Sequence, residues 1–166
     1  MSYATVAQLL TRFSADEIAA RVDRSVPRLV SAELLSAAAA GSSLAAYTAE
    51  EQAAVAAVMT RIADALAEAD STIDGYVASR FSVPVSPAPA VIVRLACDIA
   101  RYTLYDDGVT ETIQKRYDGC VALLRDIAAG RVAIGDPAGQ SLPTGGVAEM
   151  TSATPVWRRE NSDGFI

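Results

Sequence analysis

The sequence predicts an all-α fold: a small helical bundle built on a hairpin of two long helices, with an extended C-terminal tail. Of the 166 residues, 51% are apolar but only 6% are aromatic, a balance typical of closely packed helices rather than β-sandwiches. Apolar residues recur every three or four positions along two adjacent segments, as on one face of a helix. From residue 135 the composition shifts to glycine, proline, serine and threonine, which supplies no core. We therefore expect a helical domain at 1–134 and a tail at 135–166.

Two short helices are expected at the N-terminus. Thr5 is placed to cap a helix over 6–12, because a threonine hydroxyl can accept a free backbone N–H of the first turn. Ser14 and Glu17 have the spacing of a capping box, in which each side chain accepts the backbone N–H of the other residue. This pair predicts a second helix over 15–22.

Two further helix starts follow. Ser31 could begin a small helix that runs to about Ala40 and is broken by the glycine and serines after it. The clearest start in the sequence is Thr48 with Glu51, again in capping-box spacing. It opens a run to about Arg80 that contains no proline, and it forms the first helix of the hairpin.

The hairpin is predicted from two matching apolar faces that are joined by a proline-rich elbow at 82–89. Each proline lacks an N–H and restricts the residue before it, so neither helix can continue through the elbow. The first face closes on an arginine and consists of Met59, Ile62, Leu66, Ala69, Ile73, Tyr76 and Arg80. The second face consists of Ile92, Leu95, Ile99, Tyr102 and Tyr105.

A last helix is expected over 111–129, with Thr110 at its start and Gly130 at its C-terminal cap. Its apolar side would be formed by Ile113, Tyr117, Cys120 or Val121, Leu124 and Ile127. Because free cysteine behaves as a small apolar residue, we expect Cys97 and Cys120 to be buried and reduced. The alternative is a disulfide between their two helices.

The residue types argue against an enzyme. The chain has no histidine, which removes the commonest acid–base catalyst and metal ligand, and no nucleophile, phosphate-loop or dinucleotide motif is present. The acidic side chains of the first hairpin helix are expected to form a solvated face rather than a metal cluster; they are Asp64, Glu68, Asp70 and Asp74. We expect no catalytic residue, no cofactor and no metal.

The charge balance bears on partners and location. A net charge of −6 argues against a general nucleic-acid-binding surface. The alternative function kept open is a DNA-binding regulatory protein that uses the short N-terminal helices. The sequence shows no signal peptide and no apolar run of membrane-spanning length, so we expect no membrane contact and synthesis in a reducing cytoplasm.

Charged and aromatic side chains of the hairpin are candidate structural residues: Asp74, Tyr76, Arg80, Arg94, Asp98 and Arg101. Arg94 and Arg101 share a helix face, and Asp98 lies one turn from both. The favoured interpretation is an Arg–Asp–Arg ladder within the helix. The other is that these arginines hold the hairpin to Asp74 or to a neighbouring subunit.

The end of the tail has the composition of an interface anchor, since tryptophan and arginine are frequent in binding hot spots. The candidate partner-interface residues are Trp157, Arg158, Arg159, Phe165 and Ile166. The alternative is a disordered end.

Several segments resemble one protein family. They are Ile73–Phe81 (IDGYVASRF), the Val-Pro elbow with Pro89-Ala-Val, Leu95–Tyr105 (LACDIARYTLY), the start at 3–13, the segment 116–132 and the ending 157–165. These segments are similar to the small helical virion-associated protein of Mu-like phages and prophages. The segment 25–47 is longer than this family leads us to expect and is a local elaboration.

The family in turn resembles the head–tail connectors, or adaptors, of long-tailed phages. The resemblance implies a structural protein without catalysis, located at the head–tail joint of the virion after synthesis in the bacterial cytoplasm. It implies a homo-oligomeric ring, commonly of twelve copies, between the portal protein and the tail-side neck or tail-terminator proteins. DNA would pass through the lumen without sequence-specific binding, and the tail at 135–166 would be ordered by neighbouring subunits or the portal.

Overall fold

The computed structural model describes residues 2–134, the side chain of Asp107 excepted. All regular secondary structure in this range is helical, which confirms the predicted all-α fold. The elements are α1 (Val6–Arg12), α2 (Ala15–Val22), α3 (Ala32–Ala39), α4 (Ala49–Val77), α5 (Ala90–Tyr105), the 3-10 turn η1 (Asp106–Gly108) and α6 (Glu111–Ala128). The tail at 135–166 lies outside the described residues.

Local capping chemistry explains the starts of three of the six α-helices. Thr5 and Thr48 each form a complete capping box, with Gln8 and Glu51 as the reciprocal side chains. The Ser31 hydroxyl accepts the N–H of Leu34 and starts α3 as predicted.

The end of α6 also follows the prediction. Gly130 has a φ of +76° just past the helix, a left-handed conformation that glycine adopts without steric cost. Thr110 occupies the cap position at the start of α6, but its side chain makes no capping hydrogen bond.

The capping box expected for α2 is wrong. The helix begins at Ala15 as predicted, yet Ser14 makes no side-chain cap hydrogen bond. Glu17 turns away from Ser14 and accepts hydrogen bonds from Arg101 and Tyr105 of α5. The local cap is outweighed because Glu17 gains two donors at one oxygen, one of them a guanidinium whose full positive charge a backbone N–H lacks.

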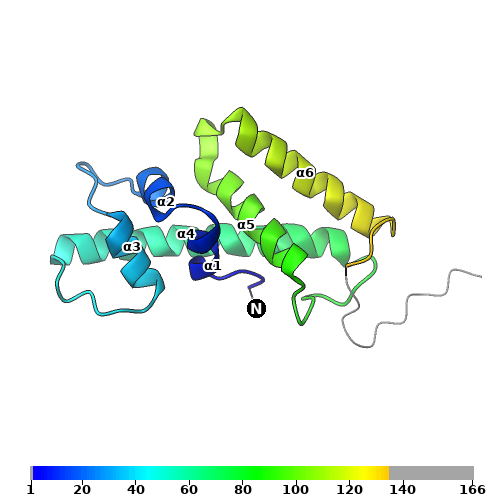
Figure 1. Ribbon diagram of the computed structural model, residues 1–166, viewed down its shortest axis with the longest axis horizontal. Helices are drawn as coiled ribbons and strands as arrows, with labels where there is room; N and C mark the ends of the chain where they lie inside the picture. The colour runs from blue at the N-terminus through cyan, green and yellow to red at the C-terminus, as the bar shows by residue number, and fades with distance from the viewer. Residues whose placement is uncertain (1, 135–166) are drawn as a thin grey trace, which may run out of the picture.

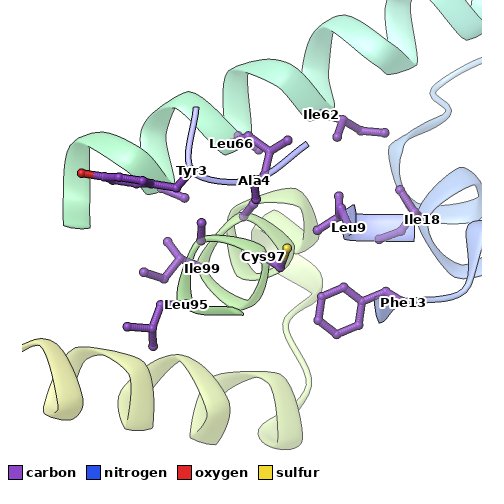
Figure 2. Close-up of a cluster of buried hydrophobic side chains, with 14 of the residues drawn as sticks. Tyr3, Ala4, Leu9, Phe13, Ile18, Ile62, Leu66, Leu95, Cys97 and Ile99 are labelled. Carbon is purple, nitrogen blue, oxygen red and sulfur yellow. The ribbon is translucent and has the colours of Figure 1, made fainter. Parts of the chain in front are cut away.

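The helices surround α5. Figure 1 shows α4 along the long axis of the molecule, α5 crossing it, and α6 returning beside α5 toward the C-terminal end of α4. The short helices α1–α3 pack beside the N-terminal part of α4. Six consecutive residues of α5, 95–100, are buried. A helix that is buried on every side is the centre of its bundle, and Figure 2 shows α5 end-on with α4, α6 and the N-terminal segment around it.

The buried face of α4 is longer than the predicted stripe. Ile62, Leu66, Ala69 and Ile73 are buried as expected, and Met59 and Tyr76 pack at its edge. Further buried residues that the stripe omitted are Val55, Val58, Ala65 and Val77. The helix ends at Val77, where the N–H groups of Arg80 and Phe81 both turn back onto the Val77 carbonyl. Arg80 therefore lies beyond the helix and is exposed, so it does not close the apolar face.

The remaining core agrees with most of the predicted faces, although Tyr102, Tyr105 and Tyr117 are only half-buried. Ile92, Leu95 and Ile99 of α5 are buried, and α6 contributes Cys120 rather than Val121. Both cysteines are free and buried, which confirms the expectation of reduced thiols. Burial raises the pKa of Cys97 and of Cys120 to about 11, so both thiols stay protonated at neutral pH.

Candidate functional site

A charged network fastens the N-terminal helices to the buried helix α5. Its first part is Asp98, whose side chain is only 9% exposed and faces α1. Arg12 donates from Nε to Oδ1 at 3.1 Å and from Nη2 to Oδ2 at 3.0 Å. A buried carboxylate requires a charged and hydrogen-bonded partner, and this two-point pairing supplies both.

The second part of the network joins α2 to the last turns of α5. Arg101 donates from Nε to the Oε1 atom of Glu17 at 2.7 Å, and the Tyr105 hydroxyl donates to the same oxygen at 2.6 Å. The Arg101 guanidinium also lies 4.5 Å from the centre of the Phe13 ring, a cation–π arrangement. Burial and the hydrogen bond to Glu17 raise the pKa of Tyr105. The phenol therefore stays a hydrogen-bond donor at neutral pH.

The predicted Arg–Asp–Arg ladder of α5 is wrong. Asp98 pairs with Arg12 of α1, and Arg101 pairs with Glu17 of α2. Arg94 is exposed and has no hydrogen-bond or ion-pair partner in the part of the chain that the structure describes. The sequence placed the three side chains on one helix face correctly, but it gave no sign that helices 80 residues away supply closer partners.

Asp74 has a different partner from the predicted arginines. It accepts a hydrogen bond from the hydroxyl of Tyr3, which in turn accepts the N–H of Val85 in the elbow at 2.8 Å. The backbone N–H of Tyr3 donates to Asp70 at 3.1 Å. Burial, followed by the hydrogen bond to Asp74, raises the pKa of Tyr3 to about 12. The N-terminal segment thus holds the end of α4 and the elbow together.

The remaining predicted hairpin residues lie apart from this network. Tyr76 packs at the edge of the core. The Arg80 guanidinium lies over Gly130, where an added Cβ atom would be 1.6 Å from its Nη1 atom. Every buried side-chain nitrogen or oxygen among residues 2–134 has a hydrogen-bond partner, so the network is complete as it stands.

An arginine-lined cleft of about 200 Å³ lies where α2, α4 and the end of α5 meet. Arg61 donates to the Val22 carbonyl at 2.9 Å, and Arg21 donates to the Tyr105 carbonyl at 2.8 Å. The cleft is also lined by Arg24 and by three carboxylates, Asp64, Glu68 and Asp106. Its charges balance, its lining includes one hydroxyl side chain, Thr103, and none of its lining residues is a histidine, lysine or cysteine. The arrangement favours packing and protein contact over a reaction.

Within residues 2–134 no group of three or more His, Cys, Asp or Glu side chains is placed to hold a metal ion. No helix in this range combines the length and apolar character needed to cross a membrane.

The predicted interface residues Trp157, Arg158, Arg159, Phe165 and Ile166 all lie outside the described residues. Conversely, Tyr3, Arg12 and Glu17 take part in these interhelical contacts although none of them was predicted to do so. Only Arg12 carried a local signal, as the basic residue of the last turn of α1, and that position did not indicate Asp98 as its partner.

Comparisons with known proteins give a consistent result. Residues 3–152 match the family described as "Bacteriophage Mu, Gp36". The chain is 34% identical over 107 residues to the Mu-like prophage FluMu protein gp36 of Haemophilus influenzae, covering 64% of this chain and 76% of that protein. It is 32% identical over 109 residues to Gene product J of Escherichia phage Mu, covering 61% of this chain and 73% of that protein.

Proposed function

The chain belongs to the bacteriophage Mu Gp36 family, and we propose that it is a structural protein of the phage particle, a connector in the neck between head and tail. The observation that carries the proposal is the family match over residues 3–152, together with two Mu-type relatives. This membership confirms the predicted resemblance to proteins of Mu-like phages. The connector role, the ring and the position at the head–tail joint are parts of the proposal.

The chemistry of the described residues supports a structural role. The two least exposed ion pairs, Arg12–Asp98 and Arg101–Glu17, join helices. The thiols of Cys97 and Cys120 are buried, and their raised pKa values keep them protonated. A body fixed by such internal contacts suits a subunit that must keep its shape in an assembly.

The alternative of a DNA-binding regulator is less well supported. A DNA-reading helix needs free basic side chains that can reach phosphates and base edges. Arg12 of α1 is bound by Asp98. Arg21 of α2 donates to the Tyr105 carbonyl, and its guanidinium lies 4.8 Å from the centre of the Tyr105 ring, so neither arginine is free for DNA. The acidic chain fits a conduit through which DNA passes, because like charge discourages adhesion.

We propose the following partners for the connector. The chain forms a homo-oligomeric ring, the portal protein lies on one side, and a tail-side neck or tail-terminator protein lies on the other. The segment at 135–166 carries the attachment, with contact residues Trp157, Arg158, Arg159, Phe165 and Ile166 near its end.

A deletion tests this function. The phage that encodes the chain is given a gene lacking residues 136–166, and particles are examined by electron microscopy and by mass spectrometry. Full heads without tails are expected, while the truncated protein keeps its helical circular-dichroism spectrum. A matched control keeps residues 157–166 and replaces 136–156 by a glycine–serine linker of equal length, which should retain tail attachment.

Two outcomes would count against different parts of the proposal. Normal virions from the deletion would contradict attachment through the tail. Absence of the full-length protein from purified virions would contradict the structural function itself.

A further inference from the structure

The connection between α2 and α3 presents an exposed apolar residue between two arginines. Val26 is 97% exposed, and Arg24 and Arg28 on either side of it are exposed as well. We call residues 24–28 the arginine loop. Figure 1 shows this connection projecting away from the body of the molecule. A single exposed valine is unremarkable by itself, so the question is whether the loop is held in place.

The arginine loop is held by the buried carboxylate of Asp23, which is 7% exposed. Oδ1 accepts the N–H of Ser25 at 2.8 Å, and Oδ2 accepts the N–H groups of Leu29 at 2.8 Å and Val30 at 2.9 Å. One side chain therefore fixes the backbone on both sides of Val26. A loop that is fixed before binding loses less conformational entropy when it binds.

The two arginines are available for a partner. Arg28 has no hydrogen-bond or ion-pair partner among residues 2–134, and the nearest carboxylate oxygen to Arg24 is that of Asp106 at 3.9 Å, with both side chains more than 70% exposed. Exposed pairs of this kind contribute little stability. The loop thus combines a fixed backbone, an apolar tip and two basic side chains on a chain whose net charge is −6.

The surface that complements this loop lies on α4. Most exposed residues on its solvent-facing side are small, so another chain can approach the α4 backbone closely. These residues are Ala53, Ala56, Thr60, Ala63, Ala67 and Ser71. The Thr60 hydroxyl is already bonded to the Ala56 carbonyl at 3.0 Å, so this side chain also offers a methyl group. The exposed charged residues of α4 are all acidic: Glu50, Asp64 and Glu68. Asp64 and Glu68 also border the cleft that Arg21, Arg24 and Arg61 line, but among residues 2–134 no ion pair joins these carboxylates to an arginine. Arg61, the one basic residue of α4, turns instead to the Val22 carbonyl.

We propose that the arginine loop of one copy docks on the outer face of α4 of a second copy, with Val26 among the small residues and Arg28 against Asp64. The two surfaces are different, so the contact is head-to-tail, and repeating it generates a closed ring when the rotation between copies allows closure. The inference rests on the proposed function, because it supplies the subunit contact that a connector ring requires. It also gives the segment after α2 a role.

Two charge-reversal variants test the docking: Arg28→Glu in the loop and Asp64→Arg on α4. Each variant alone places like charges at every contact, and like charges repel across an interface, so we expect about a tenfold or greater loss of copies per virion. Produced together in one cell, the two variants can alternate around the ring and every contact is again between opposite charges. Incorporation should then recover to within about twofold of the wild type, because attraction is restored at each contact.

The design separates this inference from the proposed function. If the wild-type protein is found in the virion and either single variant is incorporated at the same level, the docking is overturned and the connector proposal stands. Single variants that both fail, with no recovery when they are combined, would also overturn it, since only contact between copies can be repaired in the mixture. Absence of the wild-type protein from virions would overturn the proposed function and this inference with it.

Two further variants control for folding and for chemistry. Val26→Asp should reduce incorporation without changing the melting temperature, because this side chain has almost no contact within its own chain. Arg94→Glu, a charge reversal at an exposed site away from the loop, should leave incorporation unchanged; a loss equal to that of Arg28→Glu would show a general effect of charge and would overturn the proposal.

Discussion

Arg12 and Asp98, 86 residues apart in sequence, form a two-point ion pair that joins the first helix to the most buried one. The Asp98 side chain is 9% exposed, whereas the Arg12 side chain is 37% exposed. The two partners therefore differ in how much stability depends on them. Removing Arg12 leaves a buried, unpaired carboxylate, whereas removing Asp98 leaves an arginine that water can solvate.

Replacing Arg12 by methionine is expected to lower the free energy of unfolding by about 3 kcal/mol, since breaking a buried pair leaves an uncompensated charge. Urea unfolding at pH 7 measures it. Arg94→Met removes an exposed arginine without a partner in residues 2–134 and should change the free energy by less than about 0.5 kcal/mol. Adding Asp98→Leu to Arg12→Met should restore most of the loss; a double variant as unstable as the single one would contradict the stranded-charge explanation.

Glu17→Gln and Asp16→Asn remove the same charge from adjacent positions in the first turn of α2. Glu17 accepts from Arg101 and Tyr105, whereas Asp16 is exposed. Charge-assisted hydrogen bonds contribute about 1.5–3 kcal/mol each, so Glu17→Gln should lose about 2 kcal/mol of unfolding free energy. Asp16→Asn should lose only the helix-dipole contribution, about 0.5 kcal/mol. Equal thermal destabilisation of the two variants would refute the network's contribution.

Asp23 should make the fold sensitive to acid. Burial by itself would raise its pKa, but hydrogen bonds from Ser25, Val30 and Leu29 outweigh burial and lower the pKa from 3.8 to about 2. A carboxyl whose pKa is lower in the folded state stabilises the fold above its unfolded pKa, and this stability is lost as the pH falls toward 2. The difference amounts to about 2 kcal/mol.

The comparison that checks this is urea unfolding of the wild type and of Asp23→Asn at pH 5.5 and pH 2.5. The variant is expected to be less stable at the higher pH and to lose less stability on acidification. Identical losses in both proteins would assign the acid sensitivity to other carboxylates.

Gly130 and Gly75 should respond to alanine in opposite directions. Gly130 has a φ of +76°, and a Cβ atom there would collide with the flexible Arg80 side chain. Gly130→Ala should therefore cost about 1 kcal/mol, chiefly from the left-handed backbone. Gly75 lies within α4 with nothing near its Cβ position, so Gly75→Ala should gain up to about 1 kcal/mol. Melting temperatures of both variants measure the two effects. A higher melting temperature for Gly130→Ala would contradict the explanation from the left-handed backbone.

Features that depend on neighbours in sequence could be predicted. Thr5, Ser31 and Thr48 cap their helices through side chains that reach a backbone N–H three residues on. Gly130 ends its helix for an equally local reason. These interactions need only the spacing of residue types, and the spacing is visible in the sequence.

Features that depend on distant partners could not be predicted. Nothing near Asp98 distinguishes the neighbouring arginines of its own helix from Arg12, because the choice depends on how α1 packs against α5. The same holds for Glu17, which has a good local partner in Ser14 and leaves it for Arg101. At the candidate site, Asp98 and Arg101 could be predicted as structural residues from their charge and position. Their partners could not, because the partners depend on tertiary contacts.

The fastening of Tyr3 to Asp74 and Val85 has a consequence for the order in which the protein can form. The N-terminal residues leave the ribosome first, yet their hydrogen-bond partners are made more than 65 residues later, and α5, which buries them, later still. During translation α1 and α2 must wait as short helices without a core, and isolated helices of this length are barely stable in water. The bundle can close only when α5 has left the ribosome. We therefore expect the N-terminal segment to be open to proteases on stalled chains that are too short to expose residue 105 outside the exit tunnel, and protected on longer ones.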